Sequence, residues 1–222
     1  MKELSADEVR VLAAMMEKEW ITPEIYPLTL NALTNACNQK SNRVPVVQYD
    51  PAKVKGLVEG LCAKTLAIAS DVPGSRVRKY RHFFTDRFKF VPAEAALLCE
   101  LMLRGPQTLG ELRGHASRLH AFPDVASVEQ HIKNLLDVTP PWVVLLPLQP
   151  GKKEQRYMHT LMGMPNVEEW LEQEEAEERG GGSGSGGSLA ARVAQLEEEV
   201  ANLRQELQEL RERFQAFQAQ FE

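Results

Sequence analysis

The feature that most limits the possible folds of this 222-residue chain is an internal duplication. The ten residues that start at Pro73 and the ten that start at Pro150 share the pattern Pro-Gly-x-basic-x-x-basic-Tyr-x-His. The two segments align without a gap, 77 residues apart. The apolar and acidic pattern around Glu8 is likewise repeated around Glu94. A repeat of this length indicates two copies of one small domain rather than a solenoid of short units.

Each copy carries the signals of three helices followed by a β-hairpin. In the first copy the helix starts are a capping box at Ser5 and Glu8, Pro27, and the pair Asp50-Pro51. In the second copy they are Pro92, Thr108 with Glu111, and Asp124. Hairpin strands are expected at 66–69 and 77–84, and again at 142–146 and 155–161, on either side of a Pro-Gly turn. Three helices and a hairpin in about eighty residues are typical of a winged helix.

The C-terminal segment has an unbroken 4–3 spacing of apolar residues. Valines at a positions with leucines at d positions favour two parallel strands, so we expect a parallel homodimer, with a trimer as the alternative. The predicted dimerisation residues are Leu189, Val193, Leu196, Val200, Leu203, Leu207, Leu210, Phe214 and Phe217.

The expected fold class is therefore mainly α with small β-hairpins (α+β). It comprises winged-helix domains at 1–88 and 89–165, an acidic segment and Gly/Ser linker at 166–188, and a coiled-coil helix at 189–222. The Gly and Ser residues of the linker cannot bury a core, so the linker is predicted to be flexible. The acidic segment before it has two interpretations: a solvated helix, or a mimic that competes with nucleic acid.

Net charge is unevenly distributed along the chain. Residues 1–163 contain 21 Lys and Arg against 17 Asp and Glu, whereas residues 164–222 contain 5 against 14. A mildly basic body is thus joined to a strongly acidic tail, and the net charge of the whole chain, −5, says little about partners.

The basic residues of the body concentrate on the third helices, the hairpins and the segment between helices two and three. In helix-turn-helix proteins the last helix enters the major groove and a wing reaches neighbouring phosphates. The predicted nucleic-acid-binding residues are Lys40, Arg43, Lys53, Lys55, Arg76, Arg78, Lys79, Lys133, Lys152, Lys153 and Arg156.

Two functions remain open. The first is a dimeric DNA-binding regulator or nucleoid-associated protein that uses basic wings and third helices. The second is a protein-interaction scaffold that presents winged helices on a coiled-coil stalk, because exposed strands also carry Lys and Arg to block edge pairing. The expected partners are a second copy of the chain and either double-stranded DNA or another protein.

The polar segment from Asn31 to Val46 has two interpretations as well. Its Asn, Gln, Ser, Lys and Arg side chains are able to contact phosphate or base edges. Alternatively, they satisfy backbone groups in a long turn. Lys40 and Arg43 are not needed for a turn, so neither interpretation is preferred.

Other chemistry is not indicated. Cys37, Cys62 and Cys99 lie far apart and are expected to be free thiols in a reducing cytoplasm. The five histidines have no ligand spacing, and the sequence has no phosphate-binding loop or nucleophile elbow. We therefore expect a cytoplasmic protein with no enzymatic activity, no cofactor, no metal and no membrane span.

Four stretches of the body resemble the YceH family of uncharacterised bacterial proteins. They are 26–43, 74–82, 103–113 and 150–159, within a resemblance that spans residues 4 to about 163. Pro106 departs from the Ala that the family often has there. The resemblance implies a tandem winged-helix fold and implies no particular activity.

Overall fold

The computed structural model of the chain describes residues 3–70, 77–149 and 152–166, all of which belong to one compact unit. The predicted linker and coiled coil lie outside these residues. So do Arg76 and nearly all of the acidic segment. Within the described residues the fold is mixed α and β, in agreement with the expected class, and consists of helices with small antiparallel sheets.

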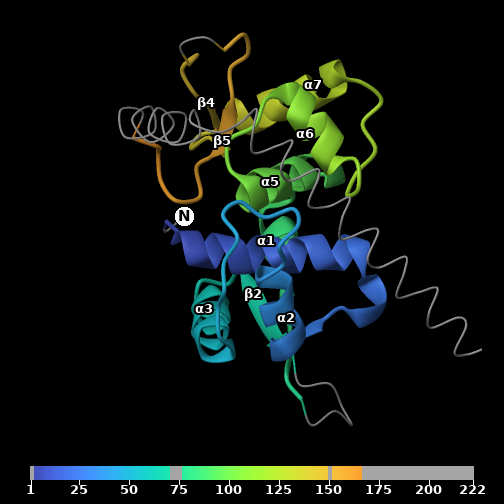
Figure 1. The fold of residues 1–222 in the computed structure, drawn as a ribbon, viewed down its shortest axis with the longest axis vertical. Helices are drawn as coiled ribbons and strands as arrows, with labels where there is room; N and C mark the ends of the chain where they lie inside the picture. The colour runs from blue at the N-terminus through green and yellow to red at the C-terminus, as the bar shows by residue number, and fades with distance from the viewer. Residues whose placement is uncertain (1–2, 71–76, 150–151, 167–222) are drawn as a thin grey trace, which may run out of the picture. The chain divides into compact units, whose positions relative to one another are not determined.

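The first half of the unit contains three main helices and a three-stranded sheet (Figure 1). A short 3-10 helix at Pro23–Ile25 follows α1. The elements in chain order are α1 (Ala6–Ile21), β1 (Leu28–Thr29), α2 (Leu30–Cys37), α3 (Pro51–Ala63), β2 (Ala67–Ser70), β3 (Lys79–His82) and α4 (Phe84–Phe88).

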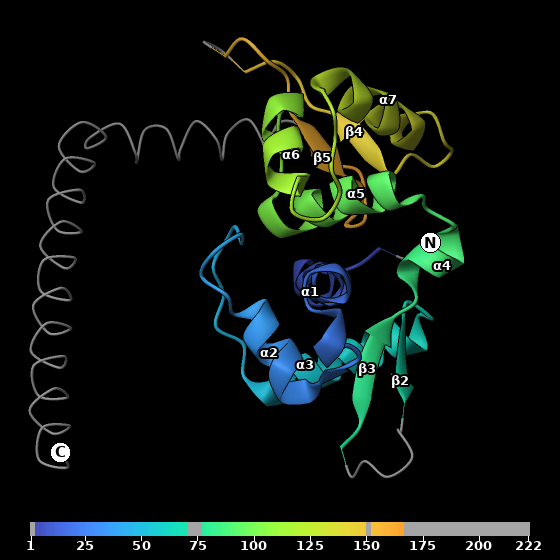
Figure 2. The same ribbon diagram turned by 90° about the vertical axis from the view of Figure 1, so that its right-hand side faces the viewer.

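The second half repeats the same order of helices and hairpin (Figure 2). Its elements are α5 (Pro92–Arg104), α6 (Leu109–Ala116), α7 (Val125–Leu136), β4 (Val143–Leu145) and β5 (Tyr157–His159).

The register of the strands places the repeated motif at equivalent positions in the two halves. The first sheet has the order β1-β3-β2, with Tyr80 of β3 opposite Leu28 of β1. In the second half Tyr157 of β5 forms an isolated bridge with Gln107, just before α6. The motif histidine also ends each hairpin pairing, opposite Ala67 in β2 and opposite Val143 in β4.

The two halves pack through their first helices. Helix α1 lies against α5, and both views show α5 directly between α1 and the other helices of the second half (Figures 1 and 2). Ala13 and Ala14 of α1 are fully buried, and Cys99 of α5 approaches closely enough for its Sγ to lie 3.5 Å from the Ala13 carbonyl oxygen. Small side chains thus permit close approach of the helices, and one continuous core spans both halves.

The helix starts follow the predicted capping signals. Ser5 and Glu8 form a capping box at α1, and Thr108 and Glu111 form another at α6. Asp50 caps α3 and accepts a hydrogen bond from the Lys53 amide at 2.8 Å. These capping bonds satisfy amide groups that a helix leaves unpaired at its first turn.

Two elements differ from the sequence prediction. Pro27 does not open α2, because Leu28 and Thr29 form β1 and the helix begins at Leu30 with Thr29 as its cap. Phe84 does not continue the hairpin but begins α4, where its ring packs against Phe88, Phe90 and Trp142. Among the described residues, no helix is long and apolar enough to span a membrane.

Candidate nucleic-acid interface

The outward face of α3 carries two of the predicted contact residues, and each lies beside an acidic side chain. Val54, Val58 and Leu61 point into the core, which leaves Lys53 and Lys55 exposed. Lys53 Nζ lies 2.7 Å from Asp7 Oδ2 and 4.3 Å from the centre of the Tyr49 ring. Lys55 Nζ lies 3.9 Å from Glu59 Oε1, one turn along the helix. Hydrogen bonds from Lys53 and Tyr49 lower the pKa of the Asp7 carboxyl, so Asp7 stays ionised beside this face.

The first hairpin carries a second group of cations. Arg78 is exposed and Lys79 is half-buried at the start of β3. Arg81 Nη1 lies 3.9 Å from Asp86 Oδ2 of α4, and its guanidinium lies 6.0 Å from the centre of the Phe83 ring. The hairpin therefore presents positive charge at its surface, partly balanced by Asp86.

In the second half, α7 takes the place of α3. Val128, Ile132 and Leu135 point into the core, and Lys133 is exposed. Next to it Gln130 donates to Asn134 at 3.3 Å, and Asn134 donates to Glu94 at 3.1 Å. Lys133 itself forms no ion pair with any residue that the structure describes.

The second hairpin contributes Lys152, Lys153 and Arg156. The two lysines are exposed, whereas Arg156 is half-buried. Arg156 donates to the Pro106 carbonyl oxygen at 3.0 Å and lies 3.5 Å from Glu111 Oε1. Those contacts anchor the hairpin to the start of α6, so Arg156 acts mainly in packing. Lys153, like Lys133, has no ion-pair partner among the described residues.

Arg43 requires a correction, because it is buried and cannot reach a phosphate in this conformation. Its Nη1 donates to Glu17 Oε1 at 3.0 Å, and its Nη2 donates to the Ala36 carbonyl oxygen at 3.0 Å and to Gln39 Oε1 at 2.9 Å. The guanidinium is therefore a structural group inside the first half. Lys40, three residues earlier, is exposed.

The other polar residues of the 31–46 segment also make internal bonds. Asn38 Nδ2 donates to the Tyr49 carbonyl oxygen, and the Tyr49 amide donates back to Asn38 Oδ1, both at 2.8 Å. Asn42 accepts a hydrogen bond from Arg104 of α5, and the Val44 amide donates to the Leu103 carbonyl oxygen at 2.9 Å. For these residues the turn interpretation agrees with the structure, with the addition that the turn is tied to the second half.

A buried charge cluster lies where these contacts meet. Glu17 of α1 and Glu100 of α5 are both buried, and Arg118 bonds to both carboxylates. Burial acts to raise the pKa of Glu17, but the hydrogen bonds from Arg43 and Arg118 outweigh it, so the pKa is lowered. For Glu100 burial prevails and the pKa is raised. Sequence reasoning missed this cluster, although a signal was present for Glu100, which interrupts an apolar stretch of its helix.

The remaining candidate groups have packing roles. Both motif histidines are buried, with His82 Nε2 2.7 Å from Glu19 Oε2 and His159 Nδ1 accepting from the Leu161 amide at 3.3 Å. The three cysteines are free, and burial raises the pKa of Cys37 to about 12. Among the described residues no cluster of three or more His, Cys, Asp or Glu is arranged to hold a metal ion.

Comparison with known proteins gives consistent matches over most of the chain. A family model described as "protein of unknown function, DUF480" matches residues 4–152. A UPF0502 protein of Geobacter sulfurreducens is 50% identical over 220 residues, which is 97% of this chain and 96% of the relative. A UPF0502 protein of Citrifermentans bemidjiense is 49% identical over 196 residues, covering 88% of this chain and 87% of the relative.

Proposed function

The chain belongs to the DUF480 family, and from its topology and surface charges we propose that it is a dimeric DNA-binding protein with two tandem winged-helix domains. The strand order β1-β3-β2, with β1 between the first two helices, supports this assignment for the first half. The Gln107–Tyr157 bridge supports it for the second half, because it takes the place of β1. In such folds the third helix and the hairpin are the parts that meet a duplex.

The observation that carries the proposal is that Lys133 and Lys153 are exposed and unpaired among the described residues. They lie on the third helix and on the hairpin of the second half, and both are exposed without an ion-pair partner among the described residues. A phosphate that binds them breaks no existing salt bridge. Lys53 and Lys55 differ, because each exchanges an acidic neighbour for a phosphate. We therefore propose that the second half supplies the larger share of the affinity.

The test is a fluorescence-anisotropy titration of a labelled 30-base-pair duplex with the full chain, at several salt concentrations. We expect Lys133→Glu and Lys153→Glu each to weaken binding about tenfold or more at low salt. Each should also reduce the slope of log affinity against log salt by about 1, because one phosphate contact is lost.

Lys89→Glu provides the matched control. Lys89 is exposed at the end of α4 and belongs to neither third helix and to neither hairpin, and the substitution changes the net charge by the same amount. We expect this variant to bind DNA within about twofold of the parent chain, because it removes no proposed contact. Equal losses in Lys89→Glu and Lys133→Glu would show only general charge attraction and would contradict the proposed interface.

A second candidate function is a protein-interaction scaffold. The observation in its favour is that four cations of the surface lie beside acidic groups: Lys53, Lys55, Arg81 and Arg156. Such pairing lowers the positive potential that attracts DNA. If the full chain binds no duplex at low salt, the scaffold becomes the better assignment, and crosslinking in cell extract should then recover a stoichiometric protein partner.

A further inference from the structure

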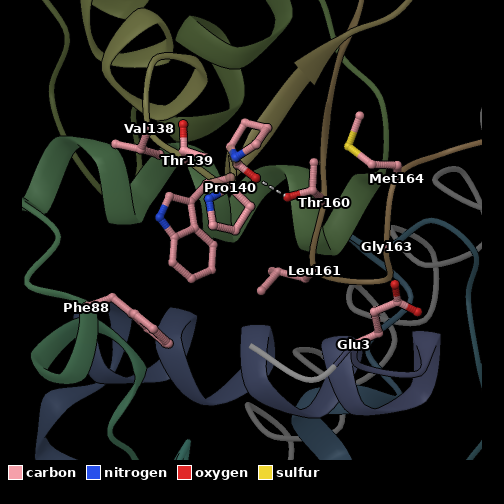
Figure 3. Close-up of a pocket in the computed structure, with 11 residues that line it drawn as sticks. Glu3, Phe88, Val138, Thr139, Pro140, Thr160, Leu161, Gly163 and Met164 are labelled. Atoms are coloured by element: carbon pink, nitrogen blue, oxygen red, sulfur yellow. Dashed lines mark hydrogen bonds between the residues drawn. The ribbon is translucent and has the colours of Figure 1, made fainter.

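A cavity of about 430 Å³ lies between the base of the second hairpin and the first residues of the chain (Figure 3). Its walls are mostly apolar and include Phe88, Pro140, Pro141, Trp142 and Leu161. The volume falls within the range of pockets that bind small organic molecules, which are also lined mainly by apolar and aromatic groups.

Hydrogen bonds and ring contacts fix the walls in place. The Leu4 amide donates to the Leu161 carbonyl oxygen at 2.8 Å, which holds the N-terminal segment against the second half. The Thr160 amide donates to the Trp142 carbonyl oxygen at 3.0 Å. The Phe88 and Trp142 rings meet edge to face with their centres 4.7 Å apart. The cavity is therefore preformed, which limits the entropy lost when a ligand binds.

Glu3 supplies the one charged side chain among the lining residues that the structure describes. Its carboxylate lies over Gly163, where a β-carbon would be only 2.8 Å from Glu3 Oε1, so the absence of a side chain at 163 makes room for it. Lys64 Nζ lies 2.7 Å from both carboxylate oxygens of Glu8, and its bond to Glu3 is to the main-chain oxygen. Among the described residues, the Glu3 carboxylate has no ion-pair partner.

These features select a positively charged ligand. The Thr160 hydroxyl already donates to the Pro141 carbonyl oxygen, and among the described residues no Lys, Arg or His lines the cavity to receive an anion. Aromatic ring faces attract cations as well as other rings. Figure 3 shows Phe88 and Glu3 at opposite ends of the cavity, with Leu161 between them.

From this geometry we propose that the cavity is a binding site for a small aromatic organic cation. The ring of the ligand lies at the Phe88 and Trp142 end, and its ammonium group lies toward Glu3. The site is independent of the proposed DNA interface, because it uses neither the third helices nor the exposed lysines.

The experiment is isothermal titration calorimetry of the full chain with three probes of similar ring size. They are (2-naphthylmethyl)trimethylammonium, 2-naphthalenemethanol and 2-naphthoate. We expect the cation to bind at least about fivefold more tightly than the neutral alcohol and the anion to bind most weakly, because one partly exposed charge pair contributes roughly that factor.

Matched variants locate the site. Glu3→Gln should abolish the preference for the cation over the alcohol, whereas Glu24→Gln, which removes an exposed carboxylate outside the cavity, should retain it. Val138 lies at the rim and is 42% exposed, so Val138→Arg should be tolerated in folding. This substitution should reverse the preference, with naphthoate then binding more tightly than the cation.

Three results would overturn the proposal. The first is equal binding of cation and anion by the parent chain, and the second is the same affinity in Glu3→Gln and Glu24→Gln. The third is an unchanged order of probes in Val138→Arg. Since reversal of preference requires a folded protein, a general loss of structure cannot imitate the expected result.

Discussion

Substitution of Arg43 by methionine gives the sharpest test of the structural role assigned to that residue. The Arg43 and Glu17 side chains are 0% and 1% exposed, so the change leaves a buried carboxylate with part of its compensation removed. Breaking a buried pair from one side typically destabilises a protein by about 3–5 kcal/mol. Arg118 still bonds to Glu17, so we expect about 3 kcal/mol, at the lower end of that range.

The assay is urea unfolding of the full chain, followed by far-ultraviolet circular dichroism. With a slope of about 2 kcal/mol per molar urea for a unit of this size, the midpoint of Arg43→Met should fall by about 1.5 M. Lys40→Met is the control, because Lys40 is exposed in the same polar segment and should change stability by less than about 0.5 kcal/mol. The double variant Glu17→Gln with Arg43→Met should be less destabilised than Arg43→Met alone, since it removes the buried charge that has lost part of its compensation.

One outcome would refute the reasoning. If Arg43→Met and Lys40→Met unfold at the same urea concentration while only Arg43→Met loses DNA affinity, then Arg43 acts at the surface. The ion pair inside the first half would then not exist in solution.

Three further predictions concern other sites. Burial lowers the pKa of His159 to about 4, against 6.5 in the unfolded chain. Protonation of His159 therefore favours unfolding as the pH falls from 6.5 to 4, and lowers the stability by at most about 3 kcal/mol. The urea midpoints measured at pH 7 and at pH 4.5 should differ less in His159→Gln than in the parent chain. Gly56→Ala should stabilise the chain by about 1 kcal/mol in thermal unfolding, because an added β-carbon in α3 meets no atom within 4 Å. The double variant Leu196→Asp with Leu203→Asp should be a monomer where the parent chain is a dimer, as measured by light scattering. An unchanged mass would exclude the proposed coiled coil as the dimerisation element.

Local sequence signals predicted most of the helix starts in the body. Ser5, Asp50, Thr108 and Asp124 cap helices as expected, because a capping side chain acts within three residues and leaves its signature in the sequence. The duplication also predicted the second hairpin from the first. Tyr157 pairs with Gln107 just before α6, as Tyr80 pairs with Leu28 just before α2.

The elements that were missed depend on distant partners. Strand β1 contains only Leu28 and Thr29, and nothing local distinguishes it from a helix start; it exists because β3 pairs with it from fifty residues away. The burial of Arg43 likewise depends on Glu17 and on the neighbouring loop. A basic residue in a polar segment is typical of an exposed contact site, and only the tertiary fold shows that Arg43 is a buried ion-pair partner.

Because α1 and α5 belong to one chain, the residues on the two sides of their interface are able to change independently. In a dimer of identical chains, a two-fold interface uses every residue twice, so each substitution appears on both sides. Covalent fusion of the two copies removes that constraint. When Glu8 is aligned with Glu94, Glu17 corresponds to Leu103 and Glu100 corresponds to Ala14. Each half therefore contributes one buried glutamate, and the two glutamates stand at positions that do not correspond. A symmetric version of this contact would bury four carboxylates where this chain buries two.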